Sequence, residues 1–109
     1  MKEATRHPQE TPLASVILVS YKNFDSTTGP CLRSLFNLSE FADLQIIVVD
    51  NASGKETTDK IQELTKDKAN IEFIPNKTNR GFPGGANDGL RRASADIVFL
   101  LDVDTIVPD

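Results

Sequence analysis

The sequence DIVFLLDVD, residues 96–104, joins an apolar run to a closely spaced pair of acids. The run from Ile97 to Leu101 predicts a strand that is buried on both faces of a parallel sheet. Asp102 and Asp104 follow directly, and in an extended backbone their carboxylates project to the same side. Carboxylates that close repel each other unless a cation lies between them, and oxygen ligands suit Mg²⁺ or Mn²⁺. The stretch therefore predicts either a metal site at a strand end or two aspartates that merely solvate that end.

The composition is that of one small globular domain. Of the 109 residues, 39% are hydrophobic and 26% are charged, which argues against a disordered chain. The formal net charge of −4 argues against a nucleic-acid partner, because such a partner requires a basic face. The longest unbroken apolar run has five residues, which excludes a membrane span, and the first fourteen residues lack the apolar core of a secretory signal. We therefore expect a cytoplasmic protein.

Hydrophobic periodicity predicts strands that alternate with helices. This alternation is typical of a mostly parallel sheet with helices on both faces. Right-handed crossovers and the usual doubly wound arrangement predict the strand order 3-2-1-4. We expect a Rossmann-like α/β domain over residues 15–109, preceded by a flexible arm over residues 1–14. The expected strands cover residues 15–20, 44–49, 70–74 and 96–101, and the expected helices cover about 30–38, 56–65 and 86–93.

Polar side chains follow three of the predicted strands at their carboxyl ends. In the expected order, the sheet reverses direction between the first and fourth strands, and ligands of such sheets bind outside the carboxyl ends at that point. Residues 20–23 and 102–104 would meet there, with Asp50 one strand away. The sequence therefore predicts a ligand site at this edge of the sheet.

Two further stretches each allow a functional and a purely structural interpretation. Asp50, followed by Asn51, could accept a hydrogen bond from a base or a ribose hydroxyl, or could form an Asx turn that reverses the chain. Residues 79–89, NRGFPGGANDG, offer glycines that let a ligand approach the backbone and a helix start that attracts anions. Arg80 could pair with a diphosphate there or remain solvated. The glycine spacing matches neither a dinucleotide-binding fingerprint nor a P-loop.

Four blocks follow one another along the chain, at residues 15–23, 48–53, 79–89 and 100–105. In this order they resemble the blocks of family 2 glycosyltransferases, with most similarity to the rhamnosyltransferase-like bacterial branch. The resemblance covers nearly everything after Ala14. It implies a GT-A fold and the transfer of a sugar, with inversion, from a nucleotide diphosphate donor.

The resemblance also implies roles for individual residues. Asp50 would contact the base or the ribose, and the loop with Tyr21 and Asn23 would flank the base. Arg80 and the glycine turn would lie by the ribose and the diphosphate. Asp102 and Asp104 would form the D-x-D motif that holds Mg²⁺ or Mn²⁺, with Asp104 as the direct ligand. The implied nucleotide-sugar contacts are Ser20, Tyr21, Asn23, Asp50, Asn51, Arg80, Gly81, Gly85, Asn87 and Asp102.

The chain departs from the family pattern after the acidic pair. In this family the acceptor half and the catalytic Asp or Glu base come well after D-x-D, whereas this sequence has five residues beyond Asp104. We therefore expect the donor-binding part of a longer glycosyltransferase, inactive alone, whose uncovered apolar surface beside the fourth strand promotes self-association. The alternative is a non-catalytic nucleotide-binding or interaction module. The residues specify neither the acceptor nor the donor sugar and base, and missing parts could place the protein at the inner face of a membrane.

Overall fold

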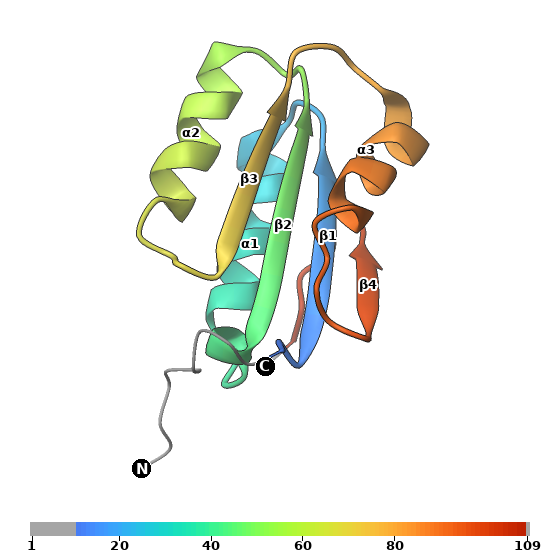
Figure 1. Cartoon of the computed structure of the whole chain (residues 1–109). Coiled ribbons are helices and arrows are strands. Elements are labelled where there is room, and N and C mark those ends of the chain that lie inside the picture. Colours follow the sequence, from blue (N-terminus) through green and yellow to red (C-terminus); the bar gives the residue numbers. More distant parts are fainter. Residues whose placement is uncertain (1–10, 109) are drawn as a thin grey trace.

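The computed structural model describes residues 11–108 and contains a four-stranded sheet in which every neighbouring pair is parallel. The strand order β3-β2-β1-β4 confirms the predicted order (Figure 1). Most of the predicted arm, residues 1–10, lies outside the described residues. Within residues 11–108, no helix is long and apolar enough to cross a membrane. The strands are β1 (Ala14–Ser20), β2 (Leu44–Asn51), β3 (Ile71–Asn76) and β4 (Val98–Leu101), and the helices are α1 (Gly29–Phe36), α2 (Lys55–Thr65) and α3 (Gly81–Leu90).

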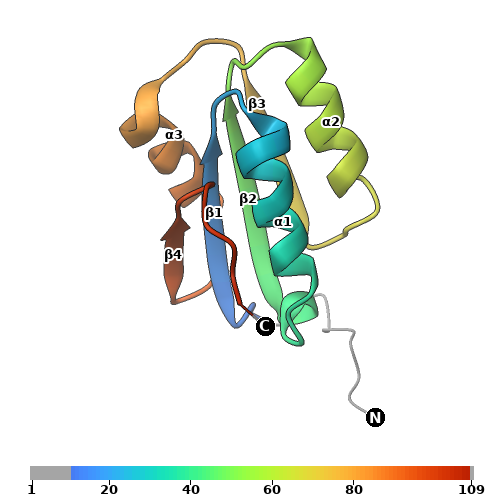
Figure 2. The same cartoon turned by 180° about the vertical axis from the view of Figure 1, so that it is seen from behind.

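Helices cover both faces of the sheet, as the sequence predicts. The helices α1 and α2 connect strands that succeed one another in the same direction across the sheet, whereas α3 connects β3 to β4 beyond β1. Because such crossovers are right-handed, the reversal of direction places α3 on the opposite face. Figures 1 and 2 show α1 on one side of the sheet and α3 on the other.

The core lies on both sides of β1 and β2. On one face, alternate residues of these strands pack with Leu32 of α1 and Ile61 of α2. On the α3 face, a smaller cluster contains Ile17, Ile47 and Val49, all of which are fully buried. The continuous apolar runs of these two strands therefore have the burial on both faces that central parallel strands require.

The strand β4 does not have the burial on both faces that its sequence predicts. Among the described strands it pairs with β1 alone and forms an edge of the sheet. The residues from Ile97 to Leu100 are between 36% and 56% exposed. Hydrophobicity shows what a strand is able to bury, but neighbouring elements decide whether it is buried, and those within residues 11–108 cover this run only in part.

The helix α3 begins at Gly81, rather than at Ala86 as the sequence predicts. A Cβ atom on Gly85 would lie 2.7 Å from Val19 Cγ1, and one on Gly89 would lie 2.6 Å from Ile17 Cγ2. Real Cβ atoms do not come that close, so both glycines allow α3 to pack tightly on β1. Glycine is a poor helix former in isolation, and this packing explains why the stretch is helical nonetheless.

The chain turns after β4, so the predicted extended geometry of the acidic pair is wrong. The Thr105 amide donates to the Asp102 carbonyl at 3.0 Å and closes a tight turn. The chain then runs back between β1 and α1, where the Val107 amide donates to the Ser34 hydroxyl at 2.9 Å (Figure 2). Both carboxylates of the pair are nevertheless exposed, while Val103 between them packs on the core.

We predict that Gly89→Ala lowers the free energy of unfolding by about 1–3 kcal/mol, because the added methyl group overpacks the layer between α3 and Ile17. The direction of this change in the free energy of unfolding is informative, since alanine normally stabilises a helix by about 1 kcal/mol relative to glycine. Asn87→Ala, at an exposed position of the same helix, is the control and should not destabilise the protein. Denaturant unfolding measures both variants, and an unchanged or raised midpoint for Gly89→Ala would contradict the tight packing.

Candidate functional site

The loops that follow β1, β2 and β4 lie at the carboxyl edge of the sheet, where the strand order reverses between β1 and β4 (Figure 1). Two of these loops contain non-glycine residues with left-handed backbone, namely Lys22 (φ 58°), Asn23 (φ 52°) and Ala52 (φ 62°). Such conformations cost roughly 1–3 kcal/mol each and are concentrated at functional sites. The surrounding hydrogen bonds must therefore hold these loops in place.

Asp50 ties the loops after β1 and β2 together. The residue is 1% exposed, and its carboxylate accepts the Ser53 amide at 3.0 Å and the Ser53 hydroxyl at 2.7 Å. The same hydroxyl oxygen accepts the Lys22 amide at 2.6 Å. The structural interpretation of Asp50, a side-chain turn that reverses the chain, is therefore present in the fold. Contact of Asp50 with a base or ribose stays a prediction.

The end of β1 and the loop after it contain one buried member of the predicted set, Ser20, and two exposed members, Tyr21 and Asn23. Ser20 is fully buried, and its hydroxyl lies 2.9 Å from Thr28 Oγ1, in the π-helical turn that precedes α1. The Asn23 carbonyl starts this turn by accepting the Thr27 amide at 2.9 Å. Tyr21 is 46% exposed, with the Lys22 ammonium 5.2 Å from the centre of its ring. Tyr21 therefore offers the surface on which a flat group such as a nucleobase could stack.

Asn51 fixes the start of α3. The residue is 2% exposed; its Nδ2 donates to the Gly81 carbonyl at 2.9 Å, and its Oδ1 accepts the Arg80 amide at 3.3 Å. These bonds hold both sides of the bend at Gly81, where φ is +70°. A Cβ atom on Gly85 would lie 3.1 Å from Asn51 Nδ2, so the absence of a side chain at Gly85 lets the amide reach this position. The structure thus brings Gly81 and Gly85 together around the Asn51 side chain.

Arg80 is paired within the chain rather than freely solvated. Its Nε donates to Asp88 Oδ2 at 2.8 Å, and Arg91 Nη1 donates to Asp88 Oδ1 at 2.8 Å. Asn76 Nδ2 donates to Asp88 Oδ2 at 3.0 Å and to Asn51 Oδ1 at 3.1 Å. Burial raises the pKa of Asp88, but the hydrogen bonds from Asn76, Arg80 and Arg91 outweigh it and hold that pKa below its ordinary value. Asp88 is therefore ionised at neutral pH. Asn87, beside it on α3, is exposed.

The acidic pair follows β4 and lies close to the start of α1. The Asp104 amide donates to Asp102 Oδ1 at 3.4 Å. Burial, and then the negative charges of Asp102 and Asp104, raise the pKa of the Cys31 thiol in α1 to about 11. Within residues 11–108, no group of three or more His, Cys, Asp or Glu side chains could hold a metal ion. The exposed oxygens fit Mg²⁺ or Mn²⁺ in the way that two carboxylates and the phosphates of a substrate do together.

Three residues that join this site were not singled out from the sequence: Ser53, Asn76 and Asp88. Ser53 lies three residues after Asp50, a distance at which a side-chain turn forms readily. Asp88 and Arg91 have the spacing of an ion pair on one helix face, and the helix predicted over residues 86–93 already contains this signal. Asn76 has no local signal, because its partners come from β2 and α3.

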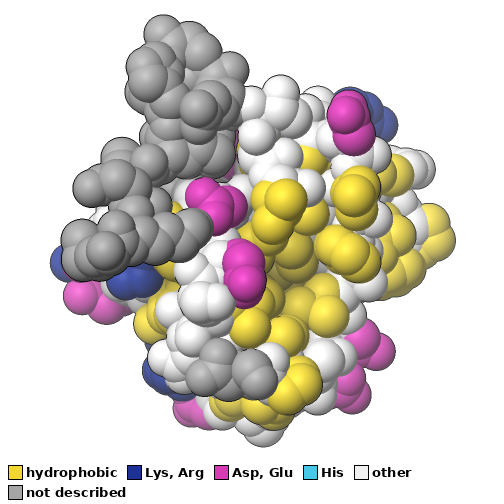
Figure 3. All heavy atoms as spheres, turned by 90° about the horizontal axis from the view of Figure 1, so that it is seen from below, with side chains coloured by type: hydrophobic (Ala, Val, Ile, Leu, Met, Phe, Trp, Pro, Cys, Tyr) yellow, Lys and Arg dark blue, Asp and Glu magenta, His cyan; other side chains and the backbone are white. Residues whose placement is uncertain are grey.

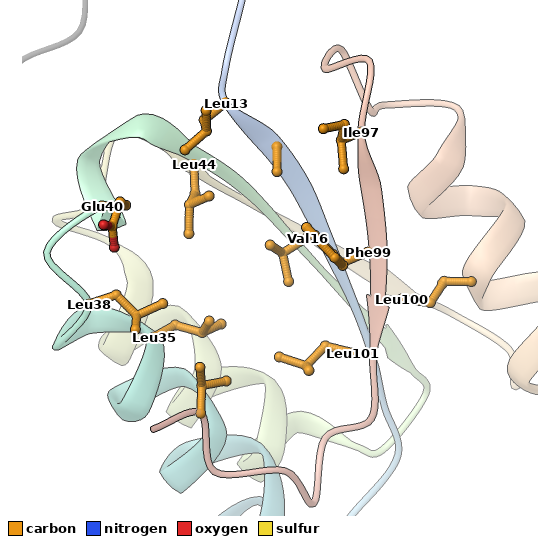
Figure 4. Close-up of a pocket in the computed structure, with 12 residues that line it drawn as sticks. Leu13, Val16, Leu35, Leu38, Glu40, Leu44, Ile97, Phe99, Leu100 and Leu101 are labelled. Atoms are coloured by element: carbon orange, nitrogen blue, oxygen red, sulfur yellow. The ribbon is translucent and has the colours of Figure 1, made fainter. Parts of the chain in front are cut away.

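A separate apolar groove lies at the amino ends of β1, β2 and β4. It has a volume of about 610 Å³, and Glu40 is the one charged residue among the described residues that line it. Figure 3 shows hydrophobic side chains gathered around a hollow on this side of the molecule. Figure 4 shows Phe99 and Leu101 of β4 across the groove from Leu35 and Leu38. Because the groove has almost no polar group, it is suited to being covered by another apolar surface rather than to catalysing a reaction.

Comparison of the sequence with known proteins gives one family. Residues 15–109 match the family described as Glycosyl transferase family 2. The chain is 31% identical over 101 residues to a poly-beta-1,6-N-acetyl-D-glucosamine synthase of Staphylococcus epidermidis. The aligned residues make up 93% of this chain and 24% of that protein. The chain thus spans about a quarter of the length of this relative.

Two solved structures share the fold. The mannosyltransferase PcManGT from Pyrobaculum calidifontis, in complex with GDP-Man and Mn²⁺, has a TM-score of 0.80 at 23% identity, over 94% of this chain and 30% of that one. TarS 1–349 of S. aureus, in complex with UDP, has a TM-score of 0.68 at 30% identity, over 84% of this chain and 27% of that one. Both similarities confirm the predicted fold, and both again cover less than a third of the other protein.

We predict that Ser53→Ala destabilises the protein by about 1–2 kcal/mol, because it removes the hydroxyl that donates to the buried Asp50 carboxylate and accepts the Lys22 amide. The Ser53 amide then remains as the one donor from this turn to Asp50. Ser26→Ala is the matched control: its hydroxyl makes a long contact of 3.4 Å with the Asn23 carbonyl, and its loss should change stability by less than about 0.5 kcal/mol. Thermal unfolding of both variants provides the comparison. Equal melting temperatures would show that this turn does not secure the loops.

Proposed function

Because the chain belongs to glycosyl transferase family 2, we propose that residues 15–109 form the donor-binding part of an inverting glycosyltransferase with the GT-A fold. The donor is a nucleotide diphosphate sugar, held with a divalent metal. The observation that carries the proposal is the meeting of the β1, β2 and β4 loops at one edge of the sheet, with the exposed acids Asp102 and Asp104 among them. The UDP held by TarS, which shares this fold, supports a nucleoside diphosphate as the ligand.

The exposure of the side chains divides the predicted contacts into two groups. Tyr21 and Arg80 present surface to solvent, and we assign them to the base and to the ribose or diphosphate respectively. Asp50 would meet the ribose or base only where its carboxylate keeps a lone pair beyond its bonds to Ser53. Ser20 and Asn51 are fully buried or nearly so and support the loops from behind. Asn23, Gly81, Gly85 and Asn87 complete the assigned set.

The metal would be held by Asp104, with Asp102 as the second carboxylate, and by the donor diphosphate. Bound there, Mg²⁺ or Mn²⁺ supplies positive charge that stabilises the leaving diphosphate. The mannosyltransferase PcManGT binds Mn²⁺ together with its own donor. The oxygen donors of this chain do not discriminate between the two ions.

We assign no catalytic base to the chain. Inverting transfer requires a base within reach of the acceptor hydroxyl. The carboxylates near the site have other partners: Asp50 accepts bonds from Ser53, Asp88 pairs with two arginines, and the acidic pair is assigned to the metal. We therefore expect the 109-residue chain to bind donor without transferring its sugar, and we leave the acceptor unassigned.

The lack of an assigned base favours a second candidate, a nucleotide-binding or interaction module without transfer activity. The two candidates differ in one measurable respect, since only a transferase releases nucleoside diphosphate in response to an acceptor. The rhamnosyltransferase-like branch stays a prediction, and none of the three proteins compared above is named for rhamnose. A cytoplasmic location likewise stays a prediction, as does a position at the inner face of a membrane through missing parts.

We predict that the protein binds one of UDP, GDP and dTDP about tenfold more tightly with Mn²⁺ than with EDTA, a difference of about 1.4 kcal/mol. Asp104→Asn should abolish this difference, because it removes a metal ligand. Asp96→Asn, at an exposed acid before β4, is the matched control and should retain it. Calorimetric titrations of the wild type and the two variants provide the test. Equal affinity of the wild type with and without metal excludes the metal site, and a wild type that binds none of the nucleotides excludes the donor site.

We further propose that two copies of the chain associate through β4. The outer edge of this strand has no paired neighbour within residues 11–108, and no charge or proline interrupts Val98–Leu101, as would be usual at a protected edge. A two-fold axis would bring two such edges together and extend the sheet. Six apolar side chains around this edge are each more than a third exposed, and a second copy would cover part of this apolar surface. These side chains are Leu13, Ile97, Val98, Phe99, Leu100 and Ile106.

We predict a dimer in sedimentation velocity at micromolar concentration and a monomer for Phe99→Lys, because the ammonium would be buried at the interface. Phe99 is 56% exposed in one copy, so the substitution should not unfold it. Leu90→Lys, on α3, replaces an apolar residue of 44% exposure outside the six side chains named above and should remain dimeric. A monomeric wild type, or a dimeric Phe99→Lys, contradicts association through this strand.

A further inference from the structure

We propose that Asp88 is a positioning residue of the donor site, which holds the Arg80 guanidinium ready for the nucleotide. This inference rests on the proposed donor-binding function. Asp88 has no assigned role in that function and was not among the residues that the sequence pointed to.

Hydrogen-bond donors surround the Asp88 carboxylate. The side chain is 15% exposed and sits among donors from three segments of the chain: Asn76 at the end of β3, Arg80 before α3, and Arg91 after α3. Three donor–acceptor distances lie between 2.8 and 3.0 Å. Charge-assisted bonds of this length are stronger than neutral ones and fix the direction of the guanidinium plane.

A second contact fixes the other end of the Arg80 side chain. A Cβ atom on Gly84 would lie 2.7 Å from the Arg80 Cβ, so the stem of Arg80 lies directly over the first turn of α3. Asp88 then holds the head group through Nε. Neither Nη atom of Arg80 makes a hydrogen bond to any residue from 11 to 108, and the side chain is 44% exposed. The arginine therefore keeps its outer donors for a ligand while its orientation is set by the fold.

The charges around Asp88 do not cancel the attraction for an anion. Two arginines share one carboxylate, which leaves the cluster of Arg80, Asp88 and Arg91 with a net charge of +1. An unheld arginine loses its rotamer freedom when it binds a ligand, whereas Arg80 has lost most of it on folding. Removing the Asp88 charge should therefore weaken nucleotide binding, even though it removes a negative charge near an anionic ligand.

The test is a double-mutant cycle on nucleotide affinity, with whichever of UDP, GDP and dTDP the wild type binds most tightly in the presence of Mn²⁺. We expect Asp88→Asn to weaken binding by roughly five- to tenfold, the scale of one oriented hydrogen bond to a charged group. In the Arg80→Ala background, the same substitution should change affinity by less than about twofold, because its effect passes through Arg80. Asp59→Asn, which breaks the exposed pair with Lys55 on α2, is the control and should bind like the wild type.

Two further variants guard against a purely structural explanation. Asp88→Glu keeps the charge and should recover part of the lost affinity. Arg80→Lys keeps the positive charge but lacks the planar guanidinium whose Nε bonds to Asp88, so it should lose as much affinity as Arg80→Ala. This measurement does not depend on whether Asp88→Asn folds well. Unchanged affinity for Asp88→Asn, or equal losses with and without Arg80, would overturn the proposal while leaving the donor site intact. A wild type that binds no nucleotide would instead overturn the donor site itself.

Discussion

The burial of β1 between two layers of helices is the constraint on which the rest of the structure depends. This strand pairs with β2 on one side and β4 on the other, and Ile17 and Leu18, which face opposite layers, are fully buried. The layer on the Ile17 face can approach closely because Gly85 and Gly89 have no side chains. A parallel strand enclosed in this way ends at the same edge as its neighbours, so the position of the site follows from the core.

At that edge, most polar side chains hold the loops and few face solvent. Asp50 binds the Ser53 turn, and Asn51 holds both sides of the bend before α3. These bonds offset the strain of three left-handed residues in the loops after β1 and β2. The exposed side chains, such as Tyr21 and Arg80, are thereby carried on a rigid polar frame, which is the arrangement that precise ligand binding requires.

Local pattern was sufficient for most of the fold and insufficient for part of the site. Continuous apolar runs and alternating helices predict the parallel sheet and its order, because parallel strands must be covered on both faces. The start of α3 was missed because glycine and proline between Gly81 and Gly85 have weak helix propensity, which packing against Val19 overrides. The partners of Asn76 could not be predicted, since they come from β2 and α3, and the pairing of Arg80 with Asp88 required the correct start of α3.

Periodicity and short ordered motifs were sufficient to predict the fold class, the strand order, the family and the edge at which the polar residues gather. The tertiary structure was needed to show which of those residues face solvent and which hold the loops. It also showed that the apolar run of β4 is exposed within residues 11–108 and that Asp102 and Asp104 flank a turn. Burial and hydrogen bonding are properties of neighbours distant in sequence, and a strand or a carboxylate does not carry in its own residues the identity of what will cover it.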